Sequence, residues 1–539
     1  MWRINPELPR WQLSVAVALY MVLADNAAFW NALFDLSGKA VAVNPLFIAA
    51  VFVAMLAVMV LLVNLTAFRY GFKPLLILIL LAAAMAGYYM GEYGVIFDKA
   101  MVTNMFLTDR AEVMELMLSP GILLHTFVFG ALPSIVVWKI RLVDQSWTAG
   151  LATQGLVMLV CLAVTGLVAF VQYKNIVIVY RENRDMLCQV NPVCPLVSVT
   201  KYLSRLNRKP LTLQAIAKDA ALIVPVNGRK KNVVVMVVGE TARAANFSLN
   251  DYARNTNPQL QQQSIINFSQ VYSCGTSTAA SLPCMFSHLG REGADRQDPA
   301  QFENLLDVLQ RADVRVLWRD NDAGCKGVCA RIATEDFYTA EVPQFCREGN
   351  CFDEILLTSI EEVISRDNKD VFIVLHQKGS HGPAYYRRYP EAYRRFTPEC
   401  TIVEVQDCSR HEIINSYDNT ILYTDFVLSE LIHLLDKHAS EYNAAMLYLS
   451  DHGESLGEHG IYLHGLPYLI APDEQIHVPM LLWLSGGYSN YMRLDPTCLT
   501  DRSQMLYSHD NLFHTVLGMF KVSTHLYQKD NDIMAPCEA

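Results

Sequence analysis

Residues Lys231–Glu240 read KNVVVMVVGE, and this stretch decides the fold of the second half of the chain. Val233–Val238 is apolar throughout and rich in β-branched side chains, which is typical of a central parallel strand buried on both faces. The run ends in a carboxylate, Glu240, and ligands of open α/β sheets gather beyond the carboxyl ends of the strands. The sequence therefore predicts an α/β fold with a polar site where this strand ends.

Two further apolar runs end in similar residues. Ala444–Ser450 (AAMLYLS) is followed by Asp451-His452-Gly453-Glu454, and Val371–His376 leads into Gly379-Ser380-His381-Gly382-Pro383. An isolated Asp-His-Gly sequence is better interpreted as a polar turn. Because Glu454 adjoins it and Glu240 ends another strand, we interpret Asp451 and His452 as ligands of a zinc-like ion. We interpret the remaining histidines near these strand ends as structural, namely His376 and His477.

A hydroxyl-rich segment lies between the first two runs. Cys274–Cys284 reads CGTSTAASLPC, which predicts a tight turn opening a short helix. Metal coordination activates a hydroxyl as a nucleophile and screens phosphate charge, while a helix N-terminus supplies donors for phosphoryl oxygens. Chemistry alone does not choose among the four hydroxyls, and each is also a possible helix cap. They belong to Thr276, Ser277, Thr278 and Ser281.

The first part of the chain has a different character. Four stretches carry no charge, at 46–68, 74–91, 116–138 and 145–173, and each approaches or exceeds the roughly 20 apolar residues that cross a bilayer. A further segment, 11–34, fits if Asp25 lies within protein, where it is a functional candidate, or near the outer interface. We predict spans at about 11–34, 46–68, 74–91, 118–138 and 149–173 within a transmembrane domain of residues 1–175, then a bridging segment (176–230) and a catalytic domain (231–539).

Loop charges predict the orientation of these spans. Lys and Arg gather before span one and in the loops after spans two and four, so these three segments are expected to face the cytoplasm. They are Arg3, Arg10, Arg69, Lys73, Lys139 and Arg141. Five spans then deliver the second half of the chain to the far side of the membrane. The formal net charge of −10 argues against a nucleic-acid partner.

Cysteine usage agrees with export. Of the 13 cysteines, only Cys161 falls in a predicted span, and close pairs in the remainder indicate disulfides of an oxidising compartment. Zinc-ribbon spacing is the weaker alternative, since each short spacing occurs singly. The predicted pairs are Cys274–Cys284, Cys325–Cys329, Cys346–Cys351 and Cys400–Cys408, whereas Cys188, Cys194, Cys498 and Cys537 stay unassigned.

Six motifs together resemble one family over nearly the whole chain. They are Val238-Gly239-Glu240-Thr241-Ala242-Arg243, the Cys274–Cys284 block with Met285-Phe286-Ser287, Trp318-Arg319-Asp320-Asn321, Gly379-Ser380-His381-Gly382-Pro383, Ser450-Asp451-His452-Gly453-Glu454-Ser455-Leu456-Gly457, and Tyr507-Ser508-His509-Asp510-Asn511. The chain resembles the lipid A phosphoethanolamine transferases, including the mobile colistin-resistance enzymes, of the alkaline phosphatase and sulfatase superfamily. The resemblance implies a five-helix transmembrane domain followed by a periplasmic α/β/α sandwich.

The resemblance also implies roles for individual residues. Thr278 is then the nucleophile and a zinc ligand beside Glu240, Asp451 and His452, while Lys326, His381, Glu454 and His464 match a donor-phosphate and second-zinc region. Asn104, Thr108 and Glu112 match a lipid-binding loop, and their spacing places them on one helical face. Without the resemblance, Lys326 is a solvated loop charge, His381 and His464 are as readily ordinary hydrogen-bonded histidines, and the loop residues are a solvated helix face.

The implied activity is transfer of phosphoethanolamine from phosphatidylethanolamine to a phosphate of lipid A through a phosphoethanolamine-threonine intermediate. We expect one tightly bound zinc ion with room for a second, a monomer in the bacterial inner membrane, and resistance to polymyxin. Rivals are an inner-core lipopolysaccharide phosphoethanolamine transferase, a glycerophosphate transferase and a non-enzymatic lipid sensor. A sulfatase needs CxPxR or SxPxR for formylglycine, which TSTAASLPC lacks.

Overall fold

The structure is a computed structural model of the chain. It describes residues 7–37, 44–67, 71–97, 99–107, 119–143, 146–172, 175–176, 184–206, 213–224, 229–338, 340, 342–347, 350–402 and 405–538. Contacts divide the chain into two units, here called the N-terminal unit (Met1–Val102 with Val113–Asn207) and the C-terminal unit (Thr103–Glu112 with Arg208–Ala539).

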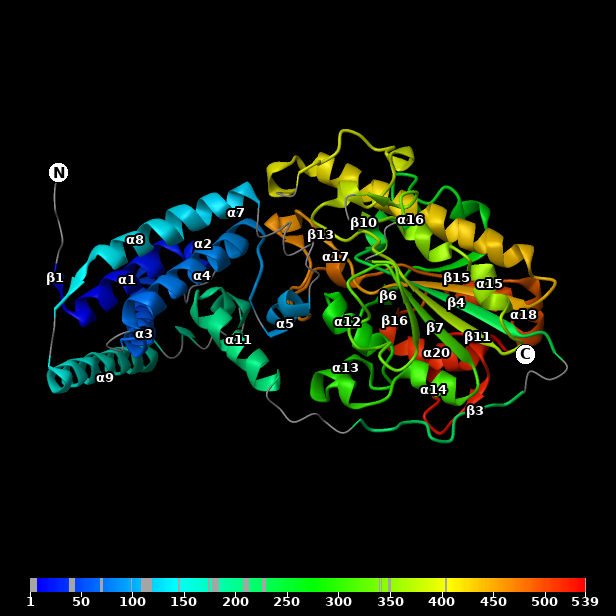
Figure 1. Cartoon of the computed structure of the whole chain (residues 1–539), viewed down its shortest axis with the longest axis horizontal. Helices are drawn as coiled ribbons and strands as arrows, with labels where there is room; N and C mark the ends of the chain where they lie inside the picture. The colour runs from blue at the N-terminus through cyan, green and yellow to red at the C-terminus, as the bar shows by residue number, and fades with distance from the viewer. Residues whose placement is uncertain are drawn as a thin grey trace. The chain divides into compact units, whose positions relative to one another are not determined.

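Long apolar helices make up the N-terminal unit (Figure 1). Four are long and apolar enough to cross a membrane: α3 (Pro45–Leu65), α4 (Phe72–Glu92), the stretch Pro120–Lys139, and Thr148–Val171 of α9 (Trp147–Val171). The third of these consists of α7 (Pro120–His125), a π-helical turn (Thr126–Ala131) and α8 (Leu132–Lys139). These helices match the second to fifth predicted spans.

The first predicted span is broken rather than continuous. Helix α1 (Arg10–Ala24) and helix α2 (Ala27–Ser37) are bent by 58° around Asp25-Asn26, and counting the pair as one span gives five. The backbone N–H of Asn191 donates to Asn26 Oδ1 at 2.8 Å, and Asn26 Nδ2 donates to the Asn191 carbonyl at 2.7 Å. The first predicted span, 11–34, is thus a bent pair of helices, and a distant asparagine meets the backbone where the helix breaks.

Among the described residues before 207, three shorter helices lie outside the long spans. They are α5 (Lys99–Leu107), a 3-10 helix (Arg184–Gln189) and α11 (Val193–Leu206). The last two fall within the residues predicted to bridge the two parts of the chain.

A seven-stranded sheet forms the centre of the C-terminal unit. Its order is β5 (Ile265–Phe268), β15 (Met480–Leu484), β12 (Asn443–Ser450), β4 (Asn232–Gly239), β11 (Val371–His376), β7 (Arg315–Asp320) and β8 (Ala333–Asp336). β12, β4, β11, β7 and β8 are parallel, whereas β15 is antiparallel to both neighbours. The three predicted strands, β12, β4 and β11, are adjacent, and every residue of each is buried.

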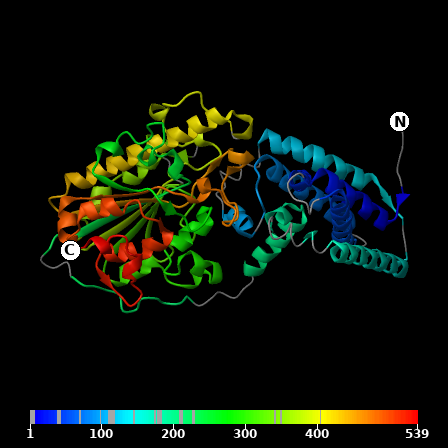
Figure 2. The ribbon, with the colours of Figure 1, turned by 180° about the vertical axis from the view of Figure 1, so that it is seen from behind.

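Helices cover both faces of this sheet, as expected for an α/β/α sandwich (Figures 1 and 2). On one face lie α12 (Thr278–Met285), α14 (Leu305–Arg311) and α20 (Leu512–Met519), whose apolar side chains share one core with Val234, Met236 and Val238 of β4. On the other lie α15 (Ile360–Ser365) and the long α16 (Arg410–Lys437). A capping box of Ser409 and Glu412 begins α16, which fixes where this helix starts.

Five disulfides join parts of the C-terminal unit. Four are the predicted pairs, Cys274–Cys284, Cys325–Cys329, Cys346–Cys351 and Cys400–Cys408. The fifth joins Cys498 to Cys537, a pairing that the sequence left open because these cysteines lie 39 residues apart.

Candidate functional site

The carboxyl ends of the central strands bring the predicted ligands together. Gly239 of β4 is in register with Ser450 of β12, so the residues that follow, Glu240 and Asp451, leave the sheet side by side. Gly379 lies after β11 with a φ of +52°, and a Cβ there would lie 2.6 Å from the Glu240 carbonyl oxygen. Glycine is therefore required where this loop passes Glu240.

Glu240, Asp451 and His452 form a buried group whose ligand atoms lie within 4.8 Å of one another. His452 Nε2 is 3.4 Å from Glu240 Oε1 and 3.5 Å from Asp451 Oδ2. His452 Nδ1 lies 2.9 Å from the Gly453 carbonyl, which selects the tautomer that donates there and turns the Nε2 lone pair toward the carboxylates. Asp451 Oδ2 is buried and has no hydrogen-bond partner in the part of the chain that the structure describes. This donor set fits a divalent metal ion.

The electrostatics of the group also favour a cation. Burial raises the pKa of Glu240, but the neighbouring imidazoles of His452, His381 and His376 outweigh burial and hold the pKa well below its usual value. Burial and the Glu240 charge raise the pKa of Asp451 well above its usual value. Two carboxylates crowded away from water repel each other, and a bound cation relieves that repulsion.

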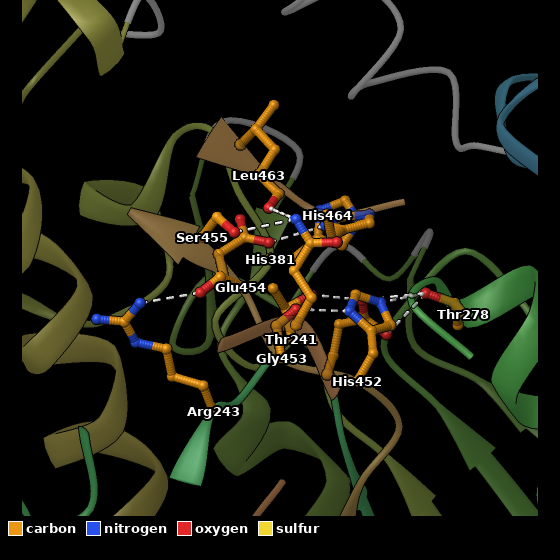
Figure 3. Close-up of polar contacts among 12 residues, drawn as sticks. Thr241, Arg243, Thr278, His381, His452, Gly453, Glu454, Ser455, Leu463 and His464 are labelled. Carbon is orange, nitrogen blue, oxygen red and sulfur yellow. Dashed lines mark hydrogen bonds and ion pairs between the residues drawn. The ribbon is translucent and has the colours of Figure 1, made fainter. Parts of the chain in front are cut away.

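Thr278 is the hydroxyl that reaches this group. It begins α12, and its Oγ1 lies 3.1 Å from both Glu240 Oε1 and Oε2 and 3.4 Å from His452 Nε2 (Figure 3). Thr276 instead donates to the Leu466 carbonyl at 2.6 Å. Geometry thus separates hydroxyls that the sequence pattern alone left equivalent.

The base of the Thr278 turn is attached to the end of β12. The Cys274–Cys284 disulfide closes the turn, and the Cys274 N–H donates to His509 Nδ1 at 3.0 Å. His509 Nε2 in turn donates to the Ser450 carbonyl at 2.9 Å, one residue before Asp451. His509 lies in a motif that supported the resemblance, but no pattern in the sequence indicated this connecting position.

A second polar cluster adjoins His452. Glu454 accepts hydrogen bonds from Tyr385 at 2.6 Å and from His464 Nδ1 at 2.9 Å, one on each carboxylate oxygen. The His464 ring lies 4.4 Å from that of His452 and 6.1 Å from that of His381, between ring centroids (Figure 3). The structure therefore brings His381, Glu454 and His464 together beside the candidate metal-binding group.

His376 lies near the second carboxylate oxygen of Glu240. Its Nε2 is 3.9 Å from Glu240 Oε2, and its Nδ1 is 3.1 Å from Asp320 Oδ2. Burial lowers the pKa of His376, but the charges of Asp320, Asp322 and Glu240 outweigh it and raise the pKa to about 9. From the sequence we interpreted His376 as structural, yet it lies next to Glu240, a predicted metal ligand.

Lys326 lies near the same buried carboxylates. Its Nζ donates to the Ala323 carbonyl at 3.0 Å. Burial raises the pKa of Asp322, and the charges of Lys378 and Lys326 act against that rise. The charge of Lys326 therefore acts on Asp322, a carboxylate close to Glu240.

Two tyrosines support the site without any sequence signal. Tyr385 contacts Glu454 as described, and the Tyr417 hydroxyl of α16 donates to the Thr241 carbonyl at 2.7 Å while accepting from the Arg243 N–H at 3.0 Å. The Arg243 guanidinium, within a motif quoted above, donates to the Glu454 carbonyl at 3.0 Å. Tyrosines on a long helix and in a loop follow no spacing rule that would mark them.

The predicted lipid-binding loop is only partly described. Asn104 lies half-buried on α5, and residues 103–107 group with the C-terminal unit. Thr108 and Glu112 lie outside the described residues, so the predicted shared helical face stays a prediction.

Comparison with known proteins covers both units. The Sulfatase family model matches residues 232–522, and the model described as Phosphoethanolamine transferase EptA/EptB matches residues 55–206. Phosphoethanolamine transferase EptA of Escherichia coli (strain K12) is 39% identical over 527 residues, which cover 96% of this chain and 95% of that protein. Phosphatidylethanolamine transferase Mcr-2 of Escherichia coli is 38% identical over 542 residues, covering 97% and 96%.

Among solved structures, the integral membrane protein lipooligosaccharide phosphoethanolamine transferase A (EptA) from Neisseria meningitidis aligns with a TM-score of 0.94 and 36% identity. The alignment covers 99% of this chain and 100% of that chain. It supports an inner-membrane protein with a periplasmic catalytic domain of alkaline phosphatase and sulfatase type. The chain therefore belongs to the lipid A phosphoethanolamine transferase family, which includes the mobile colistin-resistance enzymes.

Proposed function

We propose that this transferase moves phosphoethanolamine from phosphatidylethanolamine to a phosphate of lipid A through a covalent intermediate on Thr278. One observation carries the proposal: the Thr278 hydroxyl lies 3.1 Å from both Glu240 oxygens and 3.4 Å from His452 Nε2, at the N-terminus of α12. A hydroxyl placed there has a proton acceptor, a cation site and helix N–H groups around it, which suits attack on phosphorus.

We propose zinc as the metal, held by Glu240, Thr278, Asp451 and His452. Two carboxylates, an imidazole and a hydroxyl oxygen are ligands that zinc accepts in catalytic sites. When bound, the ion supplies positive charge that favours the ionised hydroxyl and screens phosphate oxygens. The unpartnered Asp451 Oδ2 and the orientation of His452 Nε2 support this assignment.

The first step forms a bond from Thr278 Oγ1 to the donor phosphorus and breaks the bond from phosphorus to the diacylglycerol oxygen. The proton of Thr278 leaves toward Glu240, the carboxylate to which the hydroxyl donates. Diacylglycerol departs as the alcohol when it takes the proton that Glu240 received. In the second step a hydroxyl of a lipid A phosphate attacks the phosphoethanolamine phosphorus, the bond to Thr278 breaks, and the proton of that hydroxyl passes through Glu240 to the Thr278 oxygen, which restores the enzyme.

The neighbouring residues are proposed to hold the donor phosphate. His381, His464 and Lys326 offer imidazole and ammonium groups beside the nucleophile, and Glu454 orients His464 through its Nδ1. Preorganised donors of this kind stabilise charge that develops on phosphoryl oxygens. Asn104, Thr108 and Glu112 are proposed to contact the lipid or its ethanolamine group.

We further propose that the N-terminus is cytoplasmic and that residues 1–175, 176–230 and 231–539 are the transmembrane, bridging and catalytic parts. Both substrates are then lipids of the same leaflet, and tethering raises the local concentration of the enzyme beside them. The modified surface carries less negative charge, which weakens binding of cationic peptides such as polymyxin. We propose that the enzyme acts as a monomer.

Intact mass of the full chain incubated with phosphatidylethanolamine tests the intermediate. We expect one added phosphoethanolamine, mapped to Thr278 by peptide analysis and absent from Thr278→Ala. Ser281→Ala is the matched control, because this hydroxyl lies one turn further along α12, and it should keep the adduct. A modification mapped to Thr276 or Ser277 would overturn the assignment.

Mass spectrometry of lipopolysaccharide from cells with and without the gene tests the acceptor. Phosphoethanolamine on a lipid A phosphate is the expected result. Addition to the inner core alone would favour the rival acceptor, and addition of glycerophosphate to a glucan would favour the rival donor.

A further inference from the structure

We propose that Glu240, Asp322 and His376 hold a second divalent metal ion, near the Glu240 oxygen (Oε2) that lies closer to His376, whereas His452 is nearest Oε1. The ligand atoms of these three residues lie within 4.8 Å of one another, and all three side chains are buried. Glu240 is also a ligand of the zinc ion in the proposed function. The new site rests on the proposed function only in sharing this residue with that first ion.

The main support for this site is the environment of His376 Nε2. Its Nε2 is buried, and it has no hydrogen-bond partner among the residues that the structure covers. The nearest carboxylate oxygen, Glu240 Oε2, is 3.9 Å away, which is too long for a hydrogen bond. Ligand–zinc distances of about 2.0–2.2 Å place two ligand atoms at most about 4.4 Å apart, so the gap suits two groups that share an ion.

The other ring nitrogen is held as in known metal sites. His376 Nδ1 lies 3.1 Å from Asp320 Oδ2, which also accepts from Trp318 Nε1 at 2.7 Å. The second oxygen of Asp320 accepts from the N–H groups of Asp322 and Gly324 at 2.9 and 3.2 Å. A carboxylate fixed in this way keeps the proton on Nδ1, so Nε2 is the nitrogen that gives up its proton to bind a metal ion, the arrangement that orients metal-binding histidines.

Asp322 supplies the third ligand. It is 2% exposed, and its Oδ1 makes no hydrogen bond within the described ranges. Lys378 Nζ lies 3.5 Å from the same oxygen and is the rival cation at this position. The Lys378 ammonium is at the far limit of hydrogen-bond distance from Asp322 Oδ1, and it does not account for the lack of a partner at His376 Nε2. A metal ion bound by both atoms would give each of them a partner.

The donor set indicates the class of ion. Two carboxylate oxygens and one imidazole nitrogen suit zinc or manganese better than magnesium or calcium, which prefer oxygen alone. The site differs from the second-zinc region implied by the family resemblance, which comprises Lys326, His381, Glu454 and His464. The ring of Trp318 packs edge-on to His376 with centroids 5.5 Å apart, and both side chains are buried.

Metal counting on the full chain in detergent tests the proposal without any activity assay. The protein is stripped with a chelator, dialysed against buffered free Zn²⁺, and its bound zinc is measured by elemental analysis. His376→Gln and Asp322→Asn are each expected to hold one zinc fewer than the wild type. The double variant should also lose only one, because both residues bind the same ion.

His477→Gln is the matched control, since this histidine donates to the Ser269 carbonyl and contacts no member of the group. It should hold the wild-type number of zinc ions. Wild-type counts in both His376→Gln and Asp322→Asn would overturn the proposal. Loss of every ion from the folded variants would also overturn it, because His376 would then only position Glu240. Should His376→Gln fail to fold, the isosteric Asp322→Asn decides alone.

Transfer assays on the same samples separate this proposal from the proposed function. A chain that binds the extra zinc but transfers no phosphoethanolamine would contradict the function and leave the site standing. If the Thr278 adduct forms and every variant binds the same number of zinc ions, the proposed function stands and the second metal site is contradicted.

Discussion

The hydroxyl of Thr278 faces the carboxylate of Glu240 symmetrically, with Oγ1 3.1 Å from each carboxylate oxygen. One carboxylate thus has both the proposed nucleophile and the imidazole of His452 within reach.

Glu240→Gln keeps the side-chain shape but removes the charge that accepts the Thr278 proton. We expect diacylglycerol release from phosphatidylethanolamine to fall by about 100-fold or more, together with zinc affinity. Chelation of the wild type should give the same loss, and added Zn²⁺ should restore it. The exposed Glu361→Gln serves as control and should keep wild-type turnover. A Glu240→Gln variant with normal rate would remove this carboxylate from the mechanism.

Tyr385→Phe removes the hydroxyl that donates to Glu454 at 2.6 Å and leaves the ring in place. A hydrogen bond to a charged group is worth about 1.5–3 kcal/mol, so we expect kcat to fall about tenfold or more as Glu454 and His464 lose their fixed orientation. The KM for phosphatidylethanolamine should change less. Tyr386→Phe, at the neighbouring position, should leave both constants unchanged, and an equal effect of the two substitutions would contradict the role of Tyr385.

His509 is expected to make the stability of the protein sensitive to acid. Burial lowers its pKa to about 3, from the ordinary value of 6.5. Below pH 6.5 the unfolded chain binds a proton that the folded chain refuses until about pH 3, so stability is full above pH 6.5 and falls as the pH drops. The slope for this group is about 1.4 kcal/mol per pH unit.

Thermal melting of the wild type and His509→Gln between pH 7 and pH 4 checks this expectation. Glutamine keeps a donor and an acceptor but does not titrate, so the difference in Tm between the two proteins should narrow toward acid. A constant difference across the range would show that His509 is not the acid-sensitive group.

A comparison of two disulfides separates the effect of a cross-link on the Thr278 site from its effect on the stability of the protein. Replacing both Cys274 and Cys284 with serine, or both Cys498 and Cys537, should cost about 2–4 kcal/mol of stability. Only the first pair closes the turn that carries Thr278, so only that variant should also lose transfer activity below its Tm. Equal activity in the two folded variants would show that the turn holds its shape without the cross-link.

The sequence predicted the centre because its ligands follow buried strands. The apolar runs that became β4, β12 and β11 are long enough to recognise, and parallel strands place their carboxyl ends at one edge. Glu240, Asp451 and His452 could therefore be expected to meet. The choice of Thr278 needed the family resemblance, since four hydroxyls share one short segment.

Other features depend on tertiary contacts that no local pattern encodes. The break at Asp25-Asn26 involves Asn191, 165 residues further along the chain than Asn26, so an apolar run alone indicated a continuous span. The positions of His376 and Tyr385 depend on the side chains that surround them, and single residues of these types occur in many structural settings.

Strand register has a consequence for how such enzymes diversify. The ligand positions are set by pairing within the sheet, while the segments between the strands return to it from far along the chain: Ser450 is paired with Gly239 across 211 residues. Segments between the strands that carry no site residue can lengthen, shorten or exchange side chains without moving Glu240 or Asp451, whereas the turn that carries Thr278 cannot. Surface loops of the first kind are thus free to change, while the positions that follow the paired strands are kept with the sheet.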